Sequence, residues 1–258
     1  LFSRTPFIVT IHDLILLAIQ NGSVARGQTP ALVKGLIRGL TKATTVREQR
    51  ADIGHHYDLG NQFFQLFLDP TMVYSCAYFR KKADPLELAQ RQKVDYTLRK
   101  LDLRPGERLL DIGSGWGYLI LEAAQKYGVI AHGITMSKEQ YTVTQERIKT
   151  EGLSDRVSVE LMDYRELASQ DKKSKSIFDK IVSVGMFEHV GRPNLPIFLD
   201  AIKTMLKPGG LMLLHFITKL TEETGGSFTL KYIFPGGYIP SVRETVALLP
   251  DRDFRLLD

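Results

Sequence analysis

The sequence of 258 residues lacks the features that would assign it at once to a secreted, membrane-spanning or fibrous class. Its single cysteine, Cys76, has no partner for a disulfide within the chain, which favours a reducing compartment such as the cytoplasm. Its longest apolar runs, such as residues 14–19, are far shorter than the roughly 20 residues that span a bilayer. A composition of 43% hydrophobic and 24% charged residues is ordinary for a globular protein.

The excess of positive charge is small. The 34 Lys and Arg residues against 29 Asp and Glu residues give a net charge of +5 at pH 7. A basic surface favours anionic partners such as nucleic acid, anionic lipid headgroups or acidic metabolites. A slightly basic protein with no anionic partner explains the same balance, so charge alone does not decide among these readings.

The chain divides into two parts by its hydrophobic pattern. Residues 7–11 read as a short strand, and residues 14–20 and 32–40 as helical stretches, which together are too few to bury a core. From about residue 99 strands and helices alternate, which predicts a doubly wound α/β fold with a parallel sheet. The predicted strands are 108–112, 129–134, 157–161, 178–184 and 211–217. The predicted helices are 118–126, 137–150 and 193–206, the last ended by the Lys-Pro-Gly-Gly sequence at 207–210.

A glycine cluster follows the first of these strands, in the sequence Asp111-Ile-Gly113-Ser-Gly115-Trp-Gly117. Glycines at a strand-to-helix turn let the backbone approach a ligand closely. The spacing differs from the GxGxxG of dinucleotide sites, which favours S-adenosylmethionine as the ligand. Asp111 is placed to accept a hydrogen bond from the methionine ammonium or to order the loop. A plain tight turn is the alternative.

The ends of the next two strands carry polar residues that fit the same ligand. Thr135 stands where a dinucleotide site usually has an acidic residue for the ribose, which counts against NAD. Thr135 and Gln140 are placed to bind a ribose or the methionine tail, although Ser137 and Gln140 also have the spacing of a helix cap. Asp163 is a candidate for the adenine amino group, with a solvated loop carboxylate as the alternative.

An aromatic segment precedes the sheet and is expected to cover its ligand edge. Tyr57, Tyr74 and Tyr78 are the candidates for function, because an aromatic face stabilises a sulfonium or a carbocation. Phe63, Phe64 and Phe67 recur at helical spacing and are expected mainly to pack. His55 and His56 lack the spacing of helix-face metal ligands, so no metal site is expected.

Glu188 and His215 lie at the ends of neighbouring predicted strands, so both are expected to face one cleft, where a carboxylate and an imidazole position a proton acceptor. A helix cap and a buried core histidine are the alternatives for these two residues.

Together these motifs resemble the family of cyclopropane-fatty-acyl-phospholipid synthases and mycolic acid cyclopropane synthases, which are S-adenosylmethionine-dependent methyltransferases. The resemblance covers about residue 48 to the end. It is carried by HHYDLGN at 55–61, YSCAYF at 74–79, LDIGSGWG at 110–117, GITMSKEQ at 133–140, VSVGMFEHVG at 182–191, LKPGG at 206–210, LLHFI at 213–217 and KYIFPGGYIPS at 231–241.

The resemblance implies a Rossmann-like methyltransferase domain over residues 48–258, preceded by a partial N-terminal domain or arm over residues 1–47. Family members continue past Asp258 with a further tyrosine ligand, so the chain is expected to be truncated there. The implied S-adenosylmethionine site consists of Tyr74, Ser75, Asp111, Gly113, Gly115, Gly117, Thr135, Gln140, Asp163 and Tyr164. The implied bicarbonate site consists of the Cys76 backbone, Glu188, His215 and the Ile217 backbone, with Tyr57 stabilising the cation.

The implied reaction transfers a methylene group to the cis double bond of an unsaturated phospholipid acyl chain and forms a cyclopropane ring through a carbocation that bound bicarbonate deprotonates. The implied setting is the inner face of an anionic membrane, with peripheral attachment from the cytoplasm and with a homodimer as one possible assembly. A related methyltransferase that leaves a methyl or methylene branch is the first alternative. A non-catalytic lipid- or S-adenosylmethionine-binding protein is the second. A nucleic-acid methyltransferase is not favoured, because an Asn/Asp-Pro-Pro-Tyr motif is missing after the fourth strand.

Overall fold

The computed structural model describes residues 45–46, 60–170, 177–220, 234 and 237–257. Its helices are α4 (Asn61–Gln65), α5 (Leu86–Lys100), α6 (Tyr118–Tyr127), α7 (Lys138–Thr150), α8 (Tyr164–Ser169), α9 (Phe187–Val190), α10 (Leu195–Met205) and α11 (Val242–Ala247). Its strands are β1 (Arg108–Ile112), β2 (Ile130–Thr135), β3 (Val157–Leu161), β4 (Phe178–Val184) and β5 (Leu206–His215). The strand and the two helices predicted within residues 1–40 lie outside the described residues. In the described part of the chain, no helix is long and apolar enough to cross a membrane.

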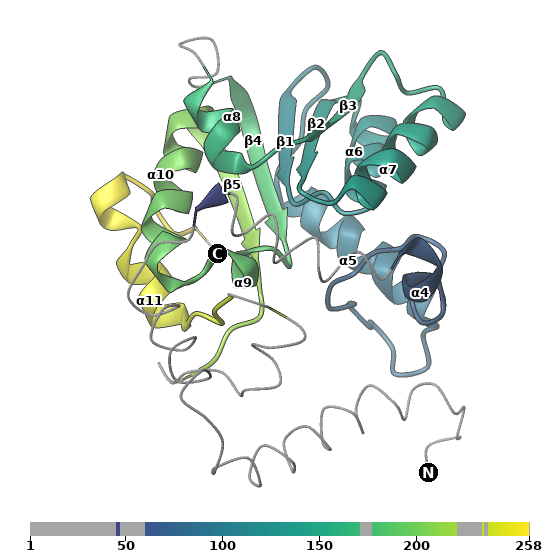
Figure 1. Cartoon of the computed structure of the whole chain (residues 1–258), viewed down its shortest axis with the longest axis horizontal. Coiled ribbons are helices and arrows are strands. Elements are labelled where there is room, and N and C mark those ends of the chain that lie inside the picture. Colours follow the sequence, from purple (N-terminus) through teal and green to yellow (C-terminus); the bar gives the residue numbers. More distant parts are fainter. Residues whose placement is uncertain (1–44, 47–59, 171–176, 221–233, 235–236, 258) are drawn as a thin grey trace, which may run out of the picture.

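The described strands form one parallel sheet in the order β3-β2-β1-β4-β5 (Figure 1). The order reverses next to β1, which pairs with β2 on one side and β4 on the other. Helices connect the parallel strands, as the alternating pattern predicts. The doubly wound α/β architecture is therefore confirmed. Its carboxyl edge opens at the point of reversal, where ligands bind in folds of this kind.

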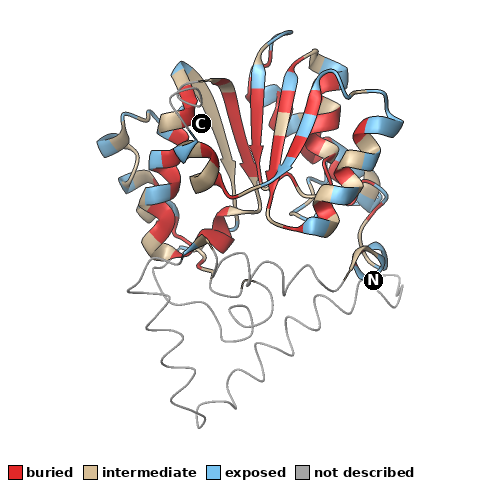
Figure 2. Cartoon of the chain, turned by 45° about the horizontal axis from the view of Figure 1, so that its top comes forward, coloured by how far each residue is buried: buried red, intermediate tan, exposed pale blue. Residues whose placement is uncertain are grey.

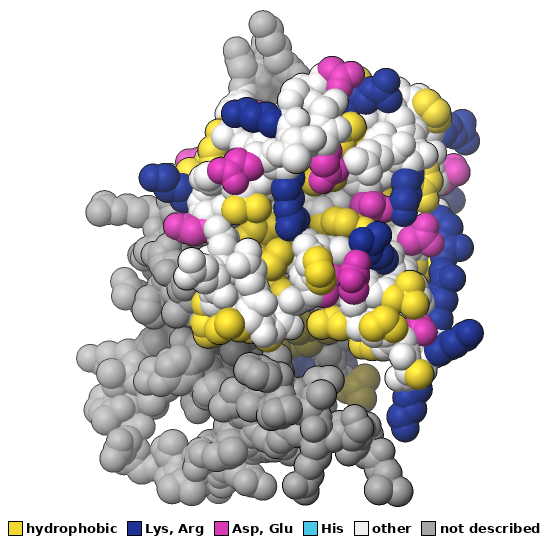
Figure 3. All heavy atoms as spheres, turned by 90° about the vertical axis from the view of Figure 1, so that its right-hand side faces the viewer, with side chains coloured by type: hydrophobic (Ala, Val, Ile, Leu, Met, Phe, Trp, Pro, Cys, Tyr) yellow, Lys and Arg dark blue, Asp and Glu magenta, His cyan; other side chains and the backbone are white. Residues whose placement is uncertain are grey.

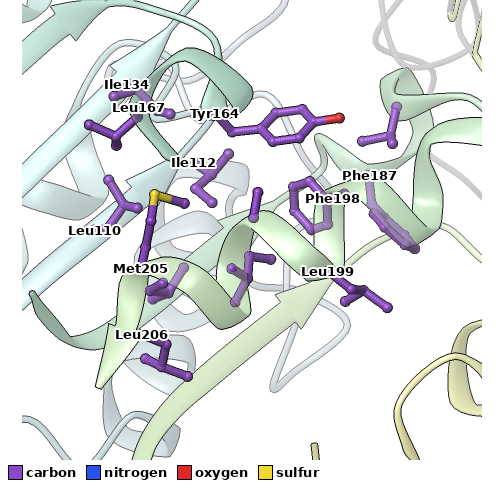
Figure 4. Packing of buried hydrophobic residues seen from close by; sticks show 14 of the residues in the cluster. Leu110, Ile112, Ile134, Tyr164, Leu167, Phe187, Phe198, Leu199, Met205 and Leu206 are labelled. Atoms are coloured by element: carbon purple, nitrogen blue, oxygen red, sulfur yellow. The ribbon is translucent and has the colours of Figure 1, made fainter. Parts of the chain in front are cut away.

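Each face of the sheet buries its own apolar layer (Figure 2). Successive strand residues point to opposite faces, so Leu110 packs into the layer under α8 and α10, whereas Leu109 packs into the layer under α5 and α6. Figure 4 shows the first layer, in which Phe198 of α10 meets Tyr164 edge-to-face at 5.0 Å between ring centroids. Burial on both faces explains why β1 and β4 contain consecutive apolar residues, such as Leu109 and Leu110 or Ile181 and Val182.

Three parts of the chain differ from the prediction. Residues 207–210 do not end a helix as a turn; β5 runs through them, with an irregular register against β4 between Phe178 and Lys180. The short helices α8 and α9 were not predicted from the sequence, because each has too few residues for an apolar period to show. Helix α5 was also missed, because its buried face carries Gln90, Gln92, Lys93 and Thr97 beside its apolar residues.

The segment before α5 is fastened over the carboxyl edge of the sheet. The indole nitrogen of Trp116 donates to Asn61 Oδ1 at 2.7 Å. The Arg147 guanidinium donates to the carbonyls of Thr71 at 3.1 Å and Trp116 at 3.0 Å, which ties α7 to both the segment and the glycine loop. Phe64 is buried against Trp116, whereas Phe63 is 43% exposed, so only part of the aromatic stripe packs as predicted. The expectation that this segment covers the ligand edge is confirmed.

The two faces of α10 predict opposite responses to truncation. Phe198→Ala removes a fully buried ring and is expected to lower the free energy of unfolding by about 3–5 kcal/mol. The neighbouring Ile197→Ala, at a side chain 40% exposed, is expected to cost about 0.5 kcal/mol or less. Denaturant unfolding followed by circular dichroism measures both. Equal losses would contradict the packing of α10 on the sheet.

Candidate active site

A cleft opens at the carboxyl ends of β1 and β4, where the strand order reverses. The residues implied to bind S-adenosylmethionine come together there from four parts of the chain. Except for Gly117, all of them line the cleft: Tyr74, Ser75, Asp111, Gly113, Gly115, Thr135, Gln140, Asp163 and Tyr164. Separate strand ends and the covering segment thus supply one site, as the parallel topology requires.

The glycine loop needs glycine at its two ends for steric reasons. Gly113 has φ +84°, and a Cβ there would lie 2.7 Å from Met186 Cγ. Gly117 has the same φ, and its Cβ would lie 2.5 Å from Thr144 Cγ2. Gly117 precedes α6 as its left-handed N-cap. It therefore shapes the turn without lining the cleft, whereas Gly113 keeps the cleft floor open.

The end of β2 is held by a short polar chain. Thr135 Oγ1 donates to Gln140 Oε1 at 2.7 Å and accepts from the Ser137 amide at 3.2 Å. Ser137 caps α7 by accepting from the Gln140 amide at 3.3 Å. Ser137 therefore caps the helix while Gln140 lines the cleft, so both predictions for these residues hold. They are compatible because the Gln140 side chain turns to Thr135 and not back to the cap. Both Thr135 and Gln140 are buried.

The end of β3 gives Asp163 a structural task as well. Its carboxylate accepts from the Arg165 amide at 2.8 Å and from the Arg165 guanidinium at 2.8 and 3.0 Å. It also forms a capping box with Glu166 at the start of α8. The alternative of a solvated loop carboxylate is wrong, because Asp163 is buried. The Tyr164 hydroxyl beside it is buried without a hydrogen-bond partner among the described residues.

The covering segment is held from α5. Gln90 Nε2 donates to the carbonyls of Val73 at 3.1 Å and Ser75 at 2.9 Å. One turn later, Lys93 Nζ donates to Ser75 Oγ at 2.5 Å. Lys93 lines the cleft and is buried, yet sequence reasoning did not single it out. A lysine in a polar helical stretch reads as a surface residue, and only its pairing with Ser75 across the fold reveals it.

Two charged groups share the floor of the cleft. Burial raises the pKa of Asp111 to about 7, against a smaller lowering by the Lys93 charge. Burial lowers the pKa of Lys93 to about 8, against the opposing attraction of Asp111. Both directions follow from removing a charge from water. The cleft therefore presents a carboxyl group and an amine that titrate near neutral pH, as is common at functional sites.

Glu188 follows β4 and His215 ends the neighbouring strand β5, as predicted, and the segments around them meet beside the cleft, although neither side chain is among the residues that line it. Val184 of β4 pairs with His215 of β5, and the Gly185 amide donates to the His215 carbonyl at 2.9 Å. Glu188 is fully buried, and its Oε1 accepts from the Ile217 amide at 2.5 Å. Within the described residues, Glu188 Oε2 and His215 Nδ1 are buried without a hydrogen-bond partner. Orphaned polar atoms of this kind need a ligand or water.

Burial sets the protonation of both groups. The pKa of the Glu188 carboxyl is raised by burial, and the hydrogen bond from the Ile217 amide lowers it in part. The pKa of His215 is lowered by burial and by the charge of Lys93. Both shifts favour the neutral side chain. When protonated, Glu188 has an O–H to donate, and a neutral His215 has one donor and one acceptor nitrogen.

The remaining predicted site residues either do not line the cleft or lie outside the described residues. Cys76 is an exposed free thiol that directly follows Ser75. Ser75 lies against the end of β4, because a Cβ on Gly185 would be 3.2 Å from Ser75 Cβ. Tyr78 is 45% exposed and stacks on Tyr96, outside the cleft lining. Tyr57, His55 and His56 lie outside the described residues.

Comparison with known proteins agrees with this geometry. The chain matches the family model described as mycolic acid cyclopropane synthetase over residues 44–258. A probable fatty acid methyltransferase of Pseudomonas putida is 41% identical over 212 residues, covering 80% of this chain and 52% of the relative. The cyclopropane-fatty-acyl-phospholipid synthase of Escherichia coli K12 is 49% identical over 190 residues, covering 73% and 47%. The crystal structure of mycolic acid cyclopropane synthase CmaA1 complexed with SAH and CTAB is 36% identical with a TM-score of 0.72, covering 81% of this chain and 76% of that chain.

The chain therefore belongs to the mycolic acid cyclopropane synthetase family, and the predicted Rossmann-like methyltransferase fold is confirmed. It spans about half the length of the two curated relatives. The division of the chain at residues 47 and 48 stays a prediction, as do the individual roles of the site residues.

Gly113 and Gly106 share a left-handed backbone conformation, but only Gly113 lines the cleft. Alanine at these two positions therefore distinguishes an effect on the cleft from an effect of backbone strain. Gly113→Ala is expected to weaken S-adenosylhomocysteine binding by about tenfold or more, because the new methyl group displaces Met186 at the cleft floor. Gly106→Ala, with φ +83° and open space around its Cβ position, carries the same strain away from the cleft and is expected to leave binding unchanged. Calorimetric titration compares the two, and equal losses would contradict the placement of Gly113.

Proposed function

We propose that this chain transfers a one-carbon unit from S-adenosylmethionine to the cis double bond of an unsaturated phospholipid acyl chain and closes a cyclopropane ring. The proposal rests on two neighbouring features, the cofactor cleft and the strand ends beside it. A cleft lined by the expected cofactor-binding residues adjoins strand ends that carry Glu188 and His215, each with a buried unpartnered atom. The name of the Escherichia coli relative supports the phospholipid substrate.

S-adenosylmethionine as co-substrate is supported from two sides. The related CmaA1 structure is complexed with SAH, the product that remains after methyl transfer. In this chain, a carboxylate at Asp111 and hydrogen-bonding groups at Thr135 and Gln140 line the cleft at successive strand ends. These groups suit an amino acid and a ribose, and the open floor at Gly113 admits the ligand.

The protein does not need to activate the nucleophile, because the alkene reacts as an uncharged group. The alkene π electrons bond to the methyl carbon, and the C–S electrons stay on sulfur, which leaves a carbocation on the acyl chain. Loss of a proton from the transferred methyl group frees an electron pair that closes the ring. The protein must exclude water from the cation, and the covering segment between α4 and α5 contributes to that task. The role of Tyr57 in stabilising the cation stays a prediction.

Bicarbonate, when bound, would supply the proton acceptor. The residues present fit it, because Glu188 Oε2 and His215 Nδ1 are buried polar atoms that lack a partner among the described residues. A protonated Glu188 would donate a hydrogen bond to an anion, whereas an ionised carboxylate would repel it. The Ile217 amide holds Glu188 Oε1 and so orients that carboxyl group. The Cys76 backbone and the Ile217 carbonyl are proposed to complete the site, since the Ile217 amide already donates to Glu188.

An anionic lipid surface is the proposed partner. Tyr78, Phe79 and Tyr96 are 43–48% exposed, and Arg80, Lys81 and Lys82 directly follow the first two. Exposed aromatic rings beside basic side chains suit the interface of a membrane. Figure 3 shows the face that holds acidic and basic side chains interspersed, with several Lys and Arg residues along one edge. Attachment from the cytoplasm and a homodimer are retained as part of the proposal.

A branched product is the second candidate, because the Pseudomonas putida relative is named a probable fatty acid methyltransferase, a name that specifies no ring. The two outcomes differ in how the carbocation is quenched. Loss of a methyl proton closes the ring, loss of a proton from the acyl chain leaves a methyl-branched alkene, and a methylene branch forms when a hydride shifts to the cationic carbon before the methyl proton is lost. A non-catalytic binding protein is less favoured, since it has no use for the buried Glu188 carboxyl group beside a cofactor cleft.

The product decides between these candidates. The natural protein is incubated with methyl-labelled S-adenosylmethionine and anionic vesicles of cis-monounsaturated phospholipid, and the acyl chains are examined by mass spectrometry and NMR. Cyclopropane protons are expected, and high salt is expected to reduce the rate by releasing the protein from the vesicles. A methyl or methylene branch would establish the second candidate. Label absent from lipid, with cofactor binding intact, would contradict the acceptor.

Glu188→Gln tests the proton-accepting part of the site. The amide keeps the shape of the side chain and can still donate from its NH2 group, but it cannot take up or release a proton. Turnover is therefore expected to fall by about a hundredfold or more while S-adenosylhomocysteine affinity stays nearly unchanged. The exposed Glu160→Gln serves as the matched control and is expected to keep full turnover. Unchanged turnover in Glu188→Gln would show that Glu188 does not hold the base.

A further inference from the structure

Lys93 is a buried cation whose placement the methyl-transfer chemistry does not account for. It lies on α5, lines the cofactor cleft and is 4% exposed. Its ammonium donates to Ser75 Oγ at 2.5 Å. Burying an ammonium group is costly unless a counter-charge or a functional ligand accompanies it. The nearby charges therefore decide what the residue does.

The groups that face Lys93 come from every element around it. Asp111 at the end of β1, Asp69 in the covering segment and the Cys76 thiol attract its charge, and His215 at the end of β5 is disfavoured as a cation by it. In the part of the chain that the structure describes, Lys93 forms no ion pair with a carboxylate. Lys93 and Asp111 thus line the same cleft as a basic and an acidic group.

The hydrogen bond from Lys93 determines how the Ser75 hydroxyl can bind a ligand. Lys93 donates to Ser75 Oγ, so a lone pair of that oxygen is occupied and the hydroxyl proton is free to be donated onward. An ammonium and a hydroxyl donor side by side suit a carboxylate. The methionyl part of S-adenosylmethionine is a zwitterion, with a carboxylate for this pair and an ammonium for Asp111.

We propose that Lys93, together with the Ser75 hydroxyl, binds the carboxylate of the methionyl part of the cofactor. Lys93 is then a cofactor-binding residue that makes the cleft selective for nucleosides carrying an amino-acid tail. The inference rests on the proposed use of S-adenosylmethionine, but it does not depend on which acceptor is methylated. Gln90, one turn away on α5, holds the Val73 and Ser75 carbonyls and keeps the pair in place.

Two ligands distinguish carboxylate binding by Lys93 from a purely structural role of this residue. S-adenosylhomocysteine carries the amino-acid tail, whereas 5′-methylthioadenosine keeps the nucleoside and sulfur but lacks the tail. Lys93→Met, similar in length but uncharged, is expected to weaken S-adenosylhomocysteine by about ten- to a hundredfold, the usual effect of losing a charge-assisted hydrogen bond. The affinity for 5′-methylthioadenosine is expected to stay the same. Calorimetric titration without lipid measures both, so failure to find the acyl product does not affect the result.

Lys180→Met is the matched control, because Lys180 is also a buried lysine but lies on β4, outside the cleft lining, near Glu107. It is expected to change neither affinity. Lys93→Arg keeps the charge and is expected to retain a preference for the ligand with the tail, which provides a readout should Lys93→Met fail to fold. Equal losses for both ligands in Lys93→Met, or no preference for the tail in Lys93→Arg, would overturn the assignment. A wild-type chain that binds neither ligand would overturn the proposed cofactor and this assignment together.

Discussion

The parallel pairing of β1 with both β2 and β4 is the constraint on which the rest of the molecule depends. It sends the chain out on opposite sides of β1, so the connections diverge and leave a cleft at the carboxyl edge. It also brings to that edge the residues that follow four different strands, among them Asp111, Thr135, Asp163 and Glu188. The site is therefore a consequence of topology, and each strand end adds one polar group to it.

Collecting polar groups at a covered edge works against stability. Asp111, Lys93 and Glu188 are each buried with a pKa displaced toward the neutral form, which means that the folded protein disfavours their charges. The two apolar layers on the faces of the sheet offset this cost, because they contain the strand interiors and the inner sides of α6 and α10. Stability and chemistry are thus placed in different parts of one sheet.

Much of this arrangement was predictable from sequence because strands and glycines leave strong local signals. The apolar runs predicted β1 to β4 to within one residue, whereas β5 begins five residues before its predicted start, and the glycine spacing indicated the cofactor loop. Helix α5 was missed for a physical reason. Gln90 and Lys93 are buried against the covering segment, Gln92 is buried against Arg80 and Asp84, and polar residues on an inward face erase the apolar period. For the same reason Lys93 was missed as a site residue. The partnership of Glu188 with the Ile217 amide joins segments 29 positions apart, which no local pattern records.

The covering segment shows why α5 accepts polar residues on its buried face. The segment between α4 and α5 must close over a ligand edge, yet it has no place in the sheet and contributes few residues to the two main apolar layers. Directional bonds therefore hold it, from Gln90 and Lys93 on one side and from Arg147 on the other. Each of these bonds also touches a wall of the cleft or the glycine loop. The same contacts therefore fasten the covering segment and shape the cleft.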